Sequence, residues 1–134
     1  MSGDEEAVLA ANAAFYAAFD RCDIDAMDAI WARSSLVACV HPGWRPLRGR
    51  AEVMASWRAI LLGPGAPSIR CAQPSAHACG DTAFVVCVEK LPGGDLVASN
   101  FFVREDSAWK LLHHHAGPIA RGDEEETPPS DLLN

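Results

Sequence analysis

Three segments in the first half of the chain carry apolar residues at the spacing of a helix. Residues 4–22 are rich in alanine and contain no glycine or proline, and their apolar residues cover more than half of the helical circumference, which predicts a largely buried helix. A second helix is predicted over residues 23–32, with Asp23 as its N-cap, and a third over residues 50–63, where a Gly-Pro pair stops it. Residues 36–40 are too few and too β-branched for a helix, so they predict a strand.

The second half of the chain changes to strand-like runs. These runs are residues 67–79, 82–91, 95–105 and 108–116. The turn sequences Gly-Asp, Pro-Gly-Gly and Asp-Ser separate them, which is typical of hairpins. Pro74 inside the first run indicates a bulge or a place at the sheet edge. Helices first and antiparallel strands second predict an α+β fold, in which the helices cover one face of a curved sheet.

The composition is that of an ordinary globular domain with an acidic surface. The chain has 134 residues, 49% hydrophobic and 22% charged, and its net charge is −7 at pH 7. We expect one domain over residues 1–118 and an acidic tail over residues 119–134. An acidic surface repels phosphate groups, so we expect no nucleic-acid partner. No apolar run is long enough to cross a bilayer and the acidic start is unlike a signal peptide, so we expect a cytoplasmic protein with no membrane partner.

The cysteines do not form a recognisable pattern. They are Cys22, Cys39, Cys71, Cys79 and Cys87. Their number is odd and no Cys-x-x-Cys pair occurs, which argues against a disulfide framework and against a thiolate zinc site. We therefore expect them to be small buried apolar residues in a reducing compartment.

Three consecutive histidines, residues 113–115, lie on the last predicted strand. Side chains on a strand alternate between its two faces, so His113 and His115 share one face and His114 takes the other. Because Trp109 belongs in the main core and shares the parity of His113, we assign His113 and His115 to the inner face. On the same reasoning, His114 points outward with Leu112.

Two alternating histidines on a strand also suggest a metal site. Neutral imidazoles suit iron, zinc or manganese, and a His-x-His pair with a third histidine holds such metals in cupin-type barrels. Those barrels are nearly all-β, however, and the first half of this chain is helical. We therefore expect no bound transition metal and no cofactor, and the commoner alternative is that buried histidines are satisfied by hydrogen bonds.

His41 ends the strand at residues 36–40 and precedes a Pro-Gly turn. Pro42 restricts His41 to an extended conformation, which places the imidazole rigidly. The side chain either caps the turn by bonding backbone or serves as a preorganised proton acceptor. Trp44 is too large for a plain exposed turn, so we expect it to cover the mouth of a pocket. The three arginines that follow, at positions 45, 48 and 50, either hold an anionic ligand or are solvated.

Together these segments resemble a known family. A long N-terminal helix, then CDIDAMDAIWA, then CVHPGWRPLRGRAEVMASW, then four strands ending in WKLLHHHAGP are similar to the SnoaL-like branch of the NTF2-like superfamily, over residues 5–118. The ending HHHAGP is also similar to that of the association domain of calcium/calmodulin-dependent kinase II. The resemblance implies a cone, in which three helices wrap a strongly curved antiparallel sheet around an open-ended pocket. It also implies a homodimer through the outer face of the sheet.

The same superfamily contains ketosteroid isomerase, which uses an aspartate base and a tyrosine in its oxyanion hole. Spacing within each segment places His41 where that base stands. The tyrosine position falls on Phe15, with Tyr16 one residue away. The resemblance and strand parity together nominate His41, His113 and His115 as catalytic residues. They nominate Phe15, Tyr16, Trp44, Trp57 and Asn100 as substrate-binding residues.

Two classes of function fit these observations. One is a cofactor-independent acid/base enzyme, of isomerase, cyclase or dehydratase type, that acts on a small apolar molecule. The other is a non-catalytic ligand-binding or association domain. Several polar groups converging on an inner pocket would favour the enzyme, and a pocket filled by tryptophan and phenylalanine would favour association. In either case we expect a homodimer, with Phe101 and Val103 on the outer face beside Leu112.

Overall fold

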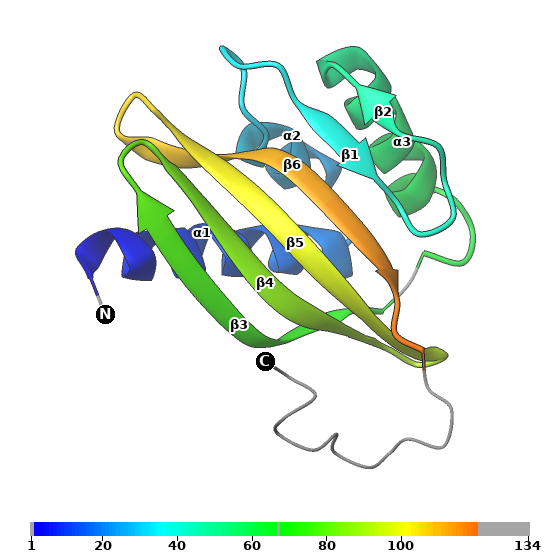
Figure 1. The fold of residues 1–134 in the computed structure, drawn as a ribbon. Helices are drawn as coiled ribbons and strands as arrows, with labels where there is room; N and C mark the ends of the chain where they lie inside the picture. Colours follow the sequence, from blue (N-terminus) through cyan, green and yellow to red (C-terminus); the bar gives the residue numbers. More distant parts are fainter. Residues whose placement is uncertain (1, 67, 121–134) are drawn as a thin grey trace, which may run out of the picture.

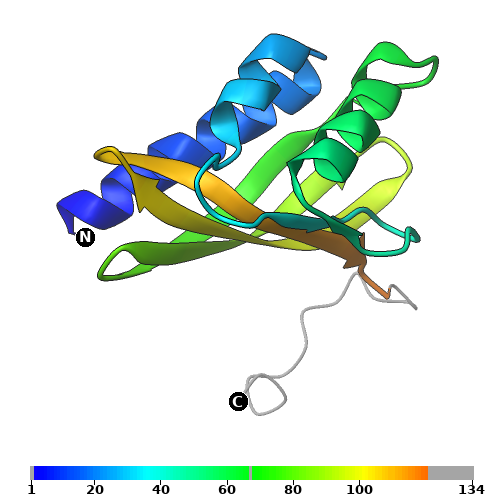
Figure 2. The ribbon, with the colours of Figure 1, turned by 90° about the horizontal axis from the view of Figure 1, so that it is seen from above.

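The computed structural model describes residues 2–66 and 68–120. Within that part, three helices cover one face of a six-stranded sheet (Figures 1 and 2). The helices are α1 (Gly3–Asp20), α2 (Ile24–Ile30) and α3 (Arg50–Leu62). The strands are β1 (Ala38–Val40), β2 (Leu47–Arg48), β3 (Arg70–Cys79), β4 (Thr82–Leu91), β5 (Gly94–Glu105) and β6 (Ala108–Pro118). The α+β class and the cone are confirmed, and the short strand β2 is an addition to the prediction.

The sheet has the strand order β2-β1-β6-β5-β4-β3. Strands β3 to β6 follow one another as antiparallel hairpins, whereas β1 runs parallel to β6. Strand β3 lies at the edge and its register shifts between Ala72 and Ser75, so both features indicated by Pro74 are present. The parallel pairing brings the end of β1, and therefore His41, beside the middle of β6.

Local signals in the sequence explain where the helices begin. Ser2 and Glu5 form a reciprocal capping box at the start of α1, and the carboxylate of Asp23 accepts from the backbone of Ala26 at the start of α2. Helix α1 packs along β3 and β4, where it buries Val8 and Phe15. Helix α3 packs against β1 and β2, so the two longer helices flank the inner face of the sheet (Figure 2).

A β-bulge in β6 reverses the predicted faces of the three histidines. Leu111 pairs with Phe102 and His113 pairs with Phe101, which leaves Leu112 as an extra residue. One extra residue moves every following side chain to the opposite face. The assignment of His113 and His115 to the inner face is therefore wrong: His114 lies inside, with 1% of its surface exposed.

Arg50 has a structural role, which neither alternative for the arginine cluster anticipated. Its guanidinium donates to the backbone carbonyls of Trp31, Ala32 and Asp28 and forms an ion pair with the Asp28 carboxylate at 2.6 Å. These bonds satisfy the carbonyls at the end of α2 and fix that helix against the start of α3. The side chains of Arg45 and Arg48 are exposed, as the solvated alternative expected.

Three remaining predictions concern the cysteines, the tail and the membrane. All five thiols are free; four are buried or half-buried, and Cys79 is exposed. The predicted acidic tail lies outside the described residues, apart from residues 119 and 120. None of the helices in the described chain combines the length and the apolar character that crossing a bilayer requires.

Candidate active site

A cavity of about 170 Å³ opens between the helices and the inner face of the sheet. Its lining is Phe19, His41, Pro42, Trp44, Ile60, Ile69, Glu89, Leu91, Leu96 and His114. Three of these residues are titratable and come from separate places, namely the end of β1, β4 and β6. The others are apolar, so the cavity sets a few ionisable groups in a mostly hydrophobic wall, which is the usual make-up of a small-molecule site.

An apolar groove of about 600 Å³ adjoins the cavity. The two share Pro42, Leu91 and Leu96, and the groove runs on past the turn between β4 and β5. A molecule too large for the inner cavity therefore has apolar surface available just outside it.

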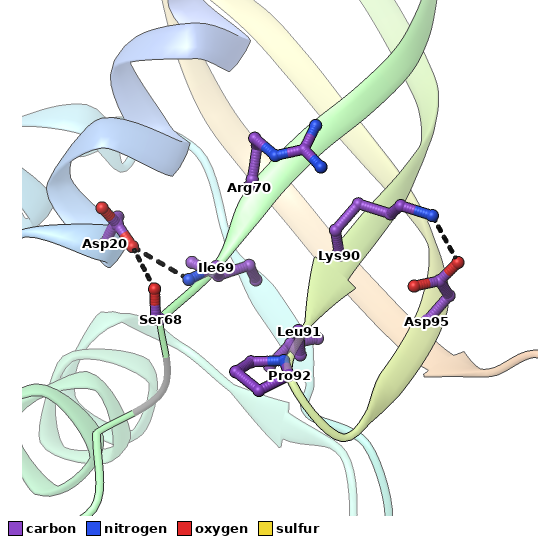
Figure 3. Close-up of a pocket in the computed structure, with 8 residues that line it drawn as sticks. All are labelled: Asp20, Ser68, Ile69, Arg70, Lys90, Leu91, Pro92 and Asp95. Atoms are coloured by element: carbon purple, nitrogen blue, oxygen red, sulfur yellow. Dashed lines mark hydrogen bonds and ion pairs between the residues drawn. The ribbon is translucent and has the colours of Figure 1, made fainter.

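A third hollow, of about 550 Å³, adjoins the cavity at Ile69 and Leu91 (Figure 3). Its polar groups are largely engaged with one another. The carboxylate of Asp20 accepts from the backbone of Ile69 at 2.9 Å, and Lys90 is paired with Asp95 at 2.7 Å. These bonds hold the start of β3 and the β4–β5 hairpin, so the smaller inner cavity is the candidate site.

His41 is buried between aromatic rings. Its imidazole meets Trp44 and Trp57 edge-on, with centroids 4.8 Å apart in both cases, and Nε2 lies 2.9 Å from the Ser56 hydroxyl. That hydroxyl donates its one hydrogen to the carbonyl of Val53 at 2.7 Å, so Nε2 donates to Ser56 and Nδ1 keeps the lone pair. The side chain therefore bonds a hydroxyl rather than the turn backbone. Burial lowers the pKa of His41 to about 4, so the imidazole is neutral near pH 7.

A network of buried polar side chains lies directly beneath the cavity. The amide nitrogen of Asn100 donates to Asn12 at 2.9 Å and to the Tyr16 hydroxyl at 3.1 Å. The Asn100 oxygen accepts from His114 Nδ1 at 2.6 Å, and the Tyr16 hydroxyl donates to Glu89 at 2.6 Å. Each member is 4% exposed or less, and the shared bonds fix the orientation of every side chain in the network.

The network determines which nitrogen of His114 is basic. Because both amide hydrogens of Asn100 are donated elsewhere, its oxygen accepts, and the proton of His114 must sit on Nδ1. The lone pair of His114 is then on Nε2, which lies 3.8 Å from the Glu89 carboxyl. Burial lowers the pKa of His114 to about 3 and raises the pKa of Glu89. Burial therefore favours the protonated form of the Glu89 carboxyl, beside a neutral imidazole, at the cavity wall.

Tyr16 supports this arrangement as a neutral hydrogen-bond donor. Burial, and then the neighbouring Glu89 carboxyl, raise the pKa of the phenol, so it keeps its proton. The tyrosine position taken from the isomerase fell on Phe15, but it is Tyr16 whose hydroxyl reaches the polar network. A tyrosine donor is thus present inside the cone, one residue further along α1.

Comparison with known proteins identifies the family. A model of the SnoaL-like domain family matches residues 8–121. The chain belongs to the SnoaL-like family. A solved structure from Streptomyces avermitilis, named as a proposed dehydratase of the NTF2-like family, is 36% identical to this SnoaL-like protein. That match covers 88% of this chain and 97% of the other, with a TM-score of 0.80.

Two further relatives have different names. A proposed calcium/calmodulin-dependent protein kinase type II association domain from Thiobacillus denitrificans is 34% identical, over 84% of this chain and 94% of that one, with a TM-score of 0.76. F-box protein SKIP8 of Arabidopsis thaliana is 23% identical over 121 residues, which are 89% of this SnoaL-like chain. The chain spans about half of that curated relative, 52% of its length.

The nominated residues separate into three groups. His41 and Trp44 line the cavity, while Tyr16 and Asn100 lie in the layer beneath it. Phe15 and Trp57 are fully buried behind the site. The ring centroid of Phe15 lies 5.0 Å from that of His114, and the ring centroid of Trp57 lies 4.8 Å from that of His41. The indole N–H of Trp57 has no hydrogen-bond partner among the described residues. His113 and His115 lie on the other face, and the structure does not bring them to the cavity.

Four residues of the site were not nominated from the sequence: Asn12, Ser56, Glu89 and His114. The signal for Glu89 was available in the run at residues 82–91. Its alternate positions 83, 85 and 87 are apolar and buried, and the same parity places Glu89 inside. A carboxylate on the buried face of a strand is rare enough to mark a candidate functional residue.

Proposed function

We propose that this SnoaL-like protein binds a small, largely apolar molecule in the inner cavity and transfers protons on it without a cofactor, as an isomerase, cyclase or dehydratase does. One observation carries the proposal: a proton donor, Glu89, and two neutral acceptors, His41 and His114, converge on a single cavity. Donor and acceptor groups with pKa values pushed apart by burial are the arrangement that acid/base catalysis uses. The similarity to a proposed dehydratase supports the same class.

The size of the cavity limits the ligand. Its volume of about 170 Å³ is near that of an engineered cavity of about 150 Å³ that admits benzene. One ring or a short chain therefore enters the cavity, and any remainder lies over Leu91 and Leu96 in the adjoining groove. The apolar lining favours a carbonyl or hydroxyl compound whose polar atom is directed at Glu89.

His41 and Glu89 would take separate roles. His41 accepts a proton from a carbon of the substrate at Nδ1, while the Glu89 carboxyl donates its proton to the substrate oxygen. His114, held by Asn100, stays neutral beside Glu89, with Nε2 3.8 Å from the carboxyl group. One proton leaves the substrate and one joins it, so the enol or the eliminated water carries no net charge.

Exchange of carbon-bound hydrogen tests the proposal without knowledge of the natural substrate. Single-ring and short-chain ketones would be incubated with the protein in D₂O, and loss of the α-proton signals followed by NMR. We expect accelerated exchange of at least one ketone, and His41→Ala should abolish it while leaving the fold intact. Below pH about 4 the rate should fall as His41 takes up a proton.

The matched control is His77→Ala, which removes an exposed histidine on the far face of the sheet. It should leave the exchange rate unchanged. If no ketone exchanges faster, or if His41→Ala retains the full rate, the acid/base function is refuted.

A non-catalytic domain is the second candidate. Phe15 and Trp57 fill much of the interior, and one relative is named as an association domain. Binding of a ketone with no exchange would favour it. For either function we propose a homodimer through the outer face of the sheet, where Phe84 and Phe101 are 37% and 40% exposed.

A further inference from the structure

Two thiols that the proposed acid/base function does not use lie beside the buried polar network. Cys71 on β3 stands directly opposite Glu89 on β4, and Cys87 precedes Glu89 by two residues, so all three side chains share the inner face of the sheet. Cys71 is half-buried and Cys87 is buried. The proposed homodimer uses the opposite face of the sheet, so it does not cover either sulfur.

The two amides of the network hold these thiols in one cluster. The side-chain nitrogen of Asn12 donates to the Cys71 sulfur at 3.6 Å, and the Asn12 oxygen accepts from Asn100 at 2.9 Å. The same nitrogen of Asn100 lies 4.0 Å from the Cys87 sulfur, and the Tyr16 hydroxyl lies 3.4 Å from that sulfur. Cys71 and Cys87 are therefore neighbours on adjacent strands, and each touches the polar layer beneath the cavity.

The contacts of the two thiols give them different reactivity. The hydrogen bond that Cys87 donates lowers the pKa of Cys71, and the one from Asn12 adds to this effect, although burial opposes both. The contact with Cys71, and then burial, raise the pKa of Cys87, so that thiol keeps its proton. Because the thiolate is the nucleophilic form, the more accessible Cys71 reacts first, and Cys87 stands ready to react second.

We propose that Cys71 and Cys87 are a redox-active pair that hydrogen peroxide converts to an intramolecular disulfide. The Cys71 sulfur attacks one peroxide oxygen and the O–O bond breaks. Cys71 becomes a sulfenic acid, and the departing hydroxide takes up the proton that Cys71 released, forming water. The Cys87 sulfur then attacks the sulfenic sulfur, and its proton leaves with the hydroxyl group as a second water. Two electrons pass from the sulfurs to the peroxide, and a dithiol reductant restores both thiols.

The bulge in β3 gives this strand the freedom that the new bond requires. Diagonal neighbours on a sheet are about 7–8 Å apart at Cα, slightly more than a disulfide spans, so β3 must shift a little. Gln73 and Pro74 together face Cys87 at the bulge, and β3 lies at the edge of the sheet. Pro74 has no N–H to give to the strand pairing, so a small shift breaks few hydrogen bonds. A disulfide closed against such a shift is readily reduced, as a reversible switch requires.

The disulfide would act on the site through Tyr16. Its formation turns the Cys87 sulfur away from the Tyr16 hydroxyl, and the shift of β3 draws Cys71 away from Asn12. Tyr16 holds the carboxyl of Glu89 by a hydrogen bond of 2.6 Å, so oxidation should loosen the proton donor of the site. This consequence rests on the proposed acid/base function, whereas formation of the disulfide does not.

Peptide mapping after peroxide treatment tests the pair. The full chain in a Cys79→Ser background, which removes the exposed thiol, would be treated with a small excess of hydrogen peroxide and digested without reduction. We expect a peptide that joins Cys71 to Cys87, two thiols fewer per chain in a thiol titration, and recovery of both thiols with dithiothreitol. In a Cys87→Ala chain, Cys71 should stop at the sulfenic acid, which dimedone labels.

Cys22→Ser is the matched control, because Cys22 is also half-buried but lies on the turn after α1. It should leave the yield of the disulfide unchanged, whereas Cys71→Ser should abolish the disulfide and leave Cys87 reduced. Circular dichroism would confirm that each variant folds. The proposal is overturned if the treated chain holds no bond between Cys71 and Cys87, or if Cys87 is oxidised as readily in Cys71→Ser as in the parent chain.

Ketone exchange by the reduced and oxidised chains separates this proposal from the proposed function. A rate that falls after peroxide, returns with dithiothreitol and is insensitive to peroxide in Cys71→Ser supports control of the site by the pair. An oxidised chain that exchanges at the full rate would overturn that control. If the reduced chain exchanges no ketone, the acid/base function is refuted, and the joined peptide still decides whether the disulfide forms.

Discussion

Lowering the pH from 7 to 5 should destabilise the folded protein because two histidines are buried in neutral form. Burial lowers the pKa of His41 to about 4 and that of His114 to about 3, from an ordinary value of 6.5. At pH 5 the unfolded chain protonates both residues, and the folded chain protonates neither. The unfolded state then binds more protons, so the free energy of unfolding falls with pH in this window. The stability that the neutral histidines contribute is fully present above pH about 6.5. It is lost as the pH falls, and the loss is complete only below pH about 3.

The size of this effect follows from the same pKa values. Between pH 7 and pH 5, a histidine that titrates at 6.5 only in the unfolded state lowers the free energy of unfolding by about 2 kcal/mol. The two residues together account for about 4 kcal/mol, a large fraction of the stability of a domain of this size. Glu89 opposes them, because its raised pKa lets the folded state hold a proton that the unfolded state has lost.

Urea unfolding followed by tryptophan fluorescence measures the effect at pH 5, 6 and 7. His41→Gln should remove about half of the histidine contribution to the pH dependence, whatever its effect on stability at pH 7. His77→Gln, at an exposed position, should change nothing. If His41→Gln keeps the full pH dependence of the wild type, the interior does not hold His41 in neutral form as described.

Three further predictions address the network, the interface and the bulge. Glu89→Gln keeps an acceptor for Tyr16 but removes the titrating acid, so urea unfolding should show a larger loss of stability between pH 7 and 5 than in the wild type. Phe101→Glu places a charge in the proposed interface and should convert the dimer to a monomer in light scattering; a monomeric wild type at micromolar concentration would refute the interface. Deletion of Leu112 removes the extra residue and should leave His114 beside Asn100, as NMR contacts between the two side chains would show; an inward His113 would contradict the bulge.

The sequence predicts the elements of this fold better than it predicts the faces of the last strand. Helical spacing and caps locate α1, α2 and α3 to within a few residues, and hairpin turns locate β3 to β6. Strand parity then fails at a single position, Leu112. A bulge is set by how two strands pair, and no glycine marks this one in the sequence. The alternating pattern therefore predicts the inner face correctly for Trp109 and Leu111. It predicts the wrong face for the three histidines at 113–115, which follow the bulge.

The site was predictable in part for the same physical reason. His41 and Trp44 were found because a Pro-Gly turn after a buried strand restricts the backbone, which is a local property. The inward position of Glu89 also follows from parity along one regular strand. The partnership of Glu89 with Tyr16 and His114 joins α1, β4 and β6, and no local pattern in the sequence reports which of these elements meet.

The interior argues for chemistry more strongly than for association alone. An association domain needs a stable core, and a core is most stable when apolar side chains fill it. This SnoaL-like protein instead buries Glu89, His114 and His41 around a cavity, and each must be kept neutral at a cost in stability. Asn100 and Asn12 add buried amides whose bonds serve mainly to orient Tyr16 and His114. Departures from a stable core of this kind are expected at functional sites, which supports the proposed acid/base function, and the pH dependence of unfolding measures how much stability the buried histidines cost.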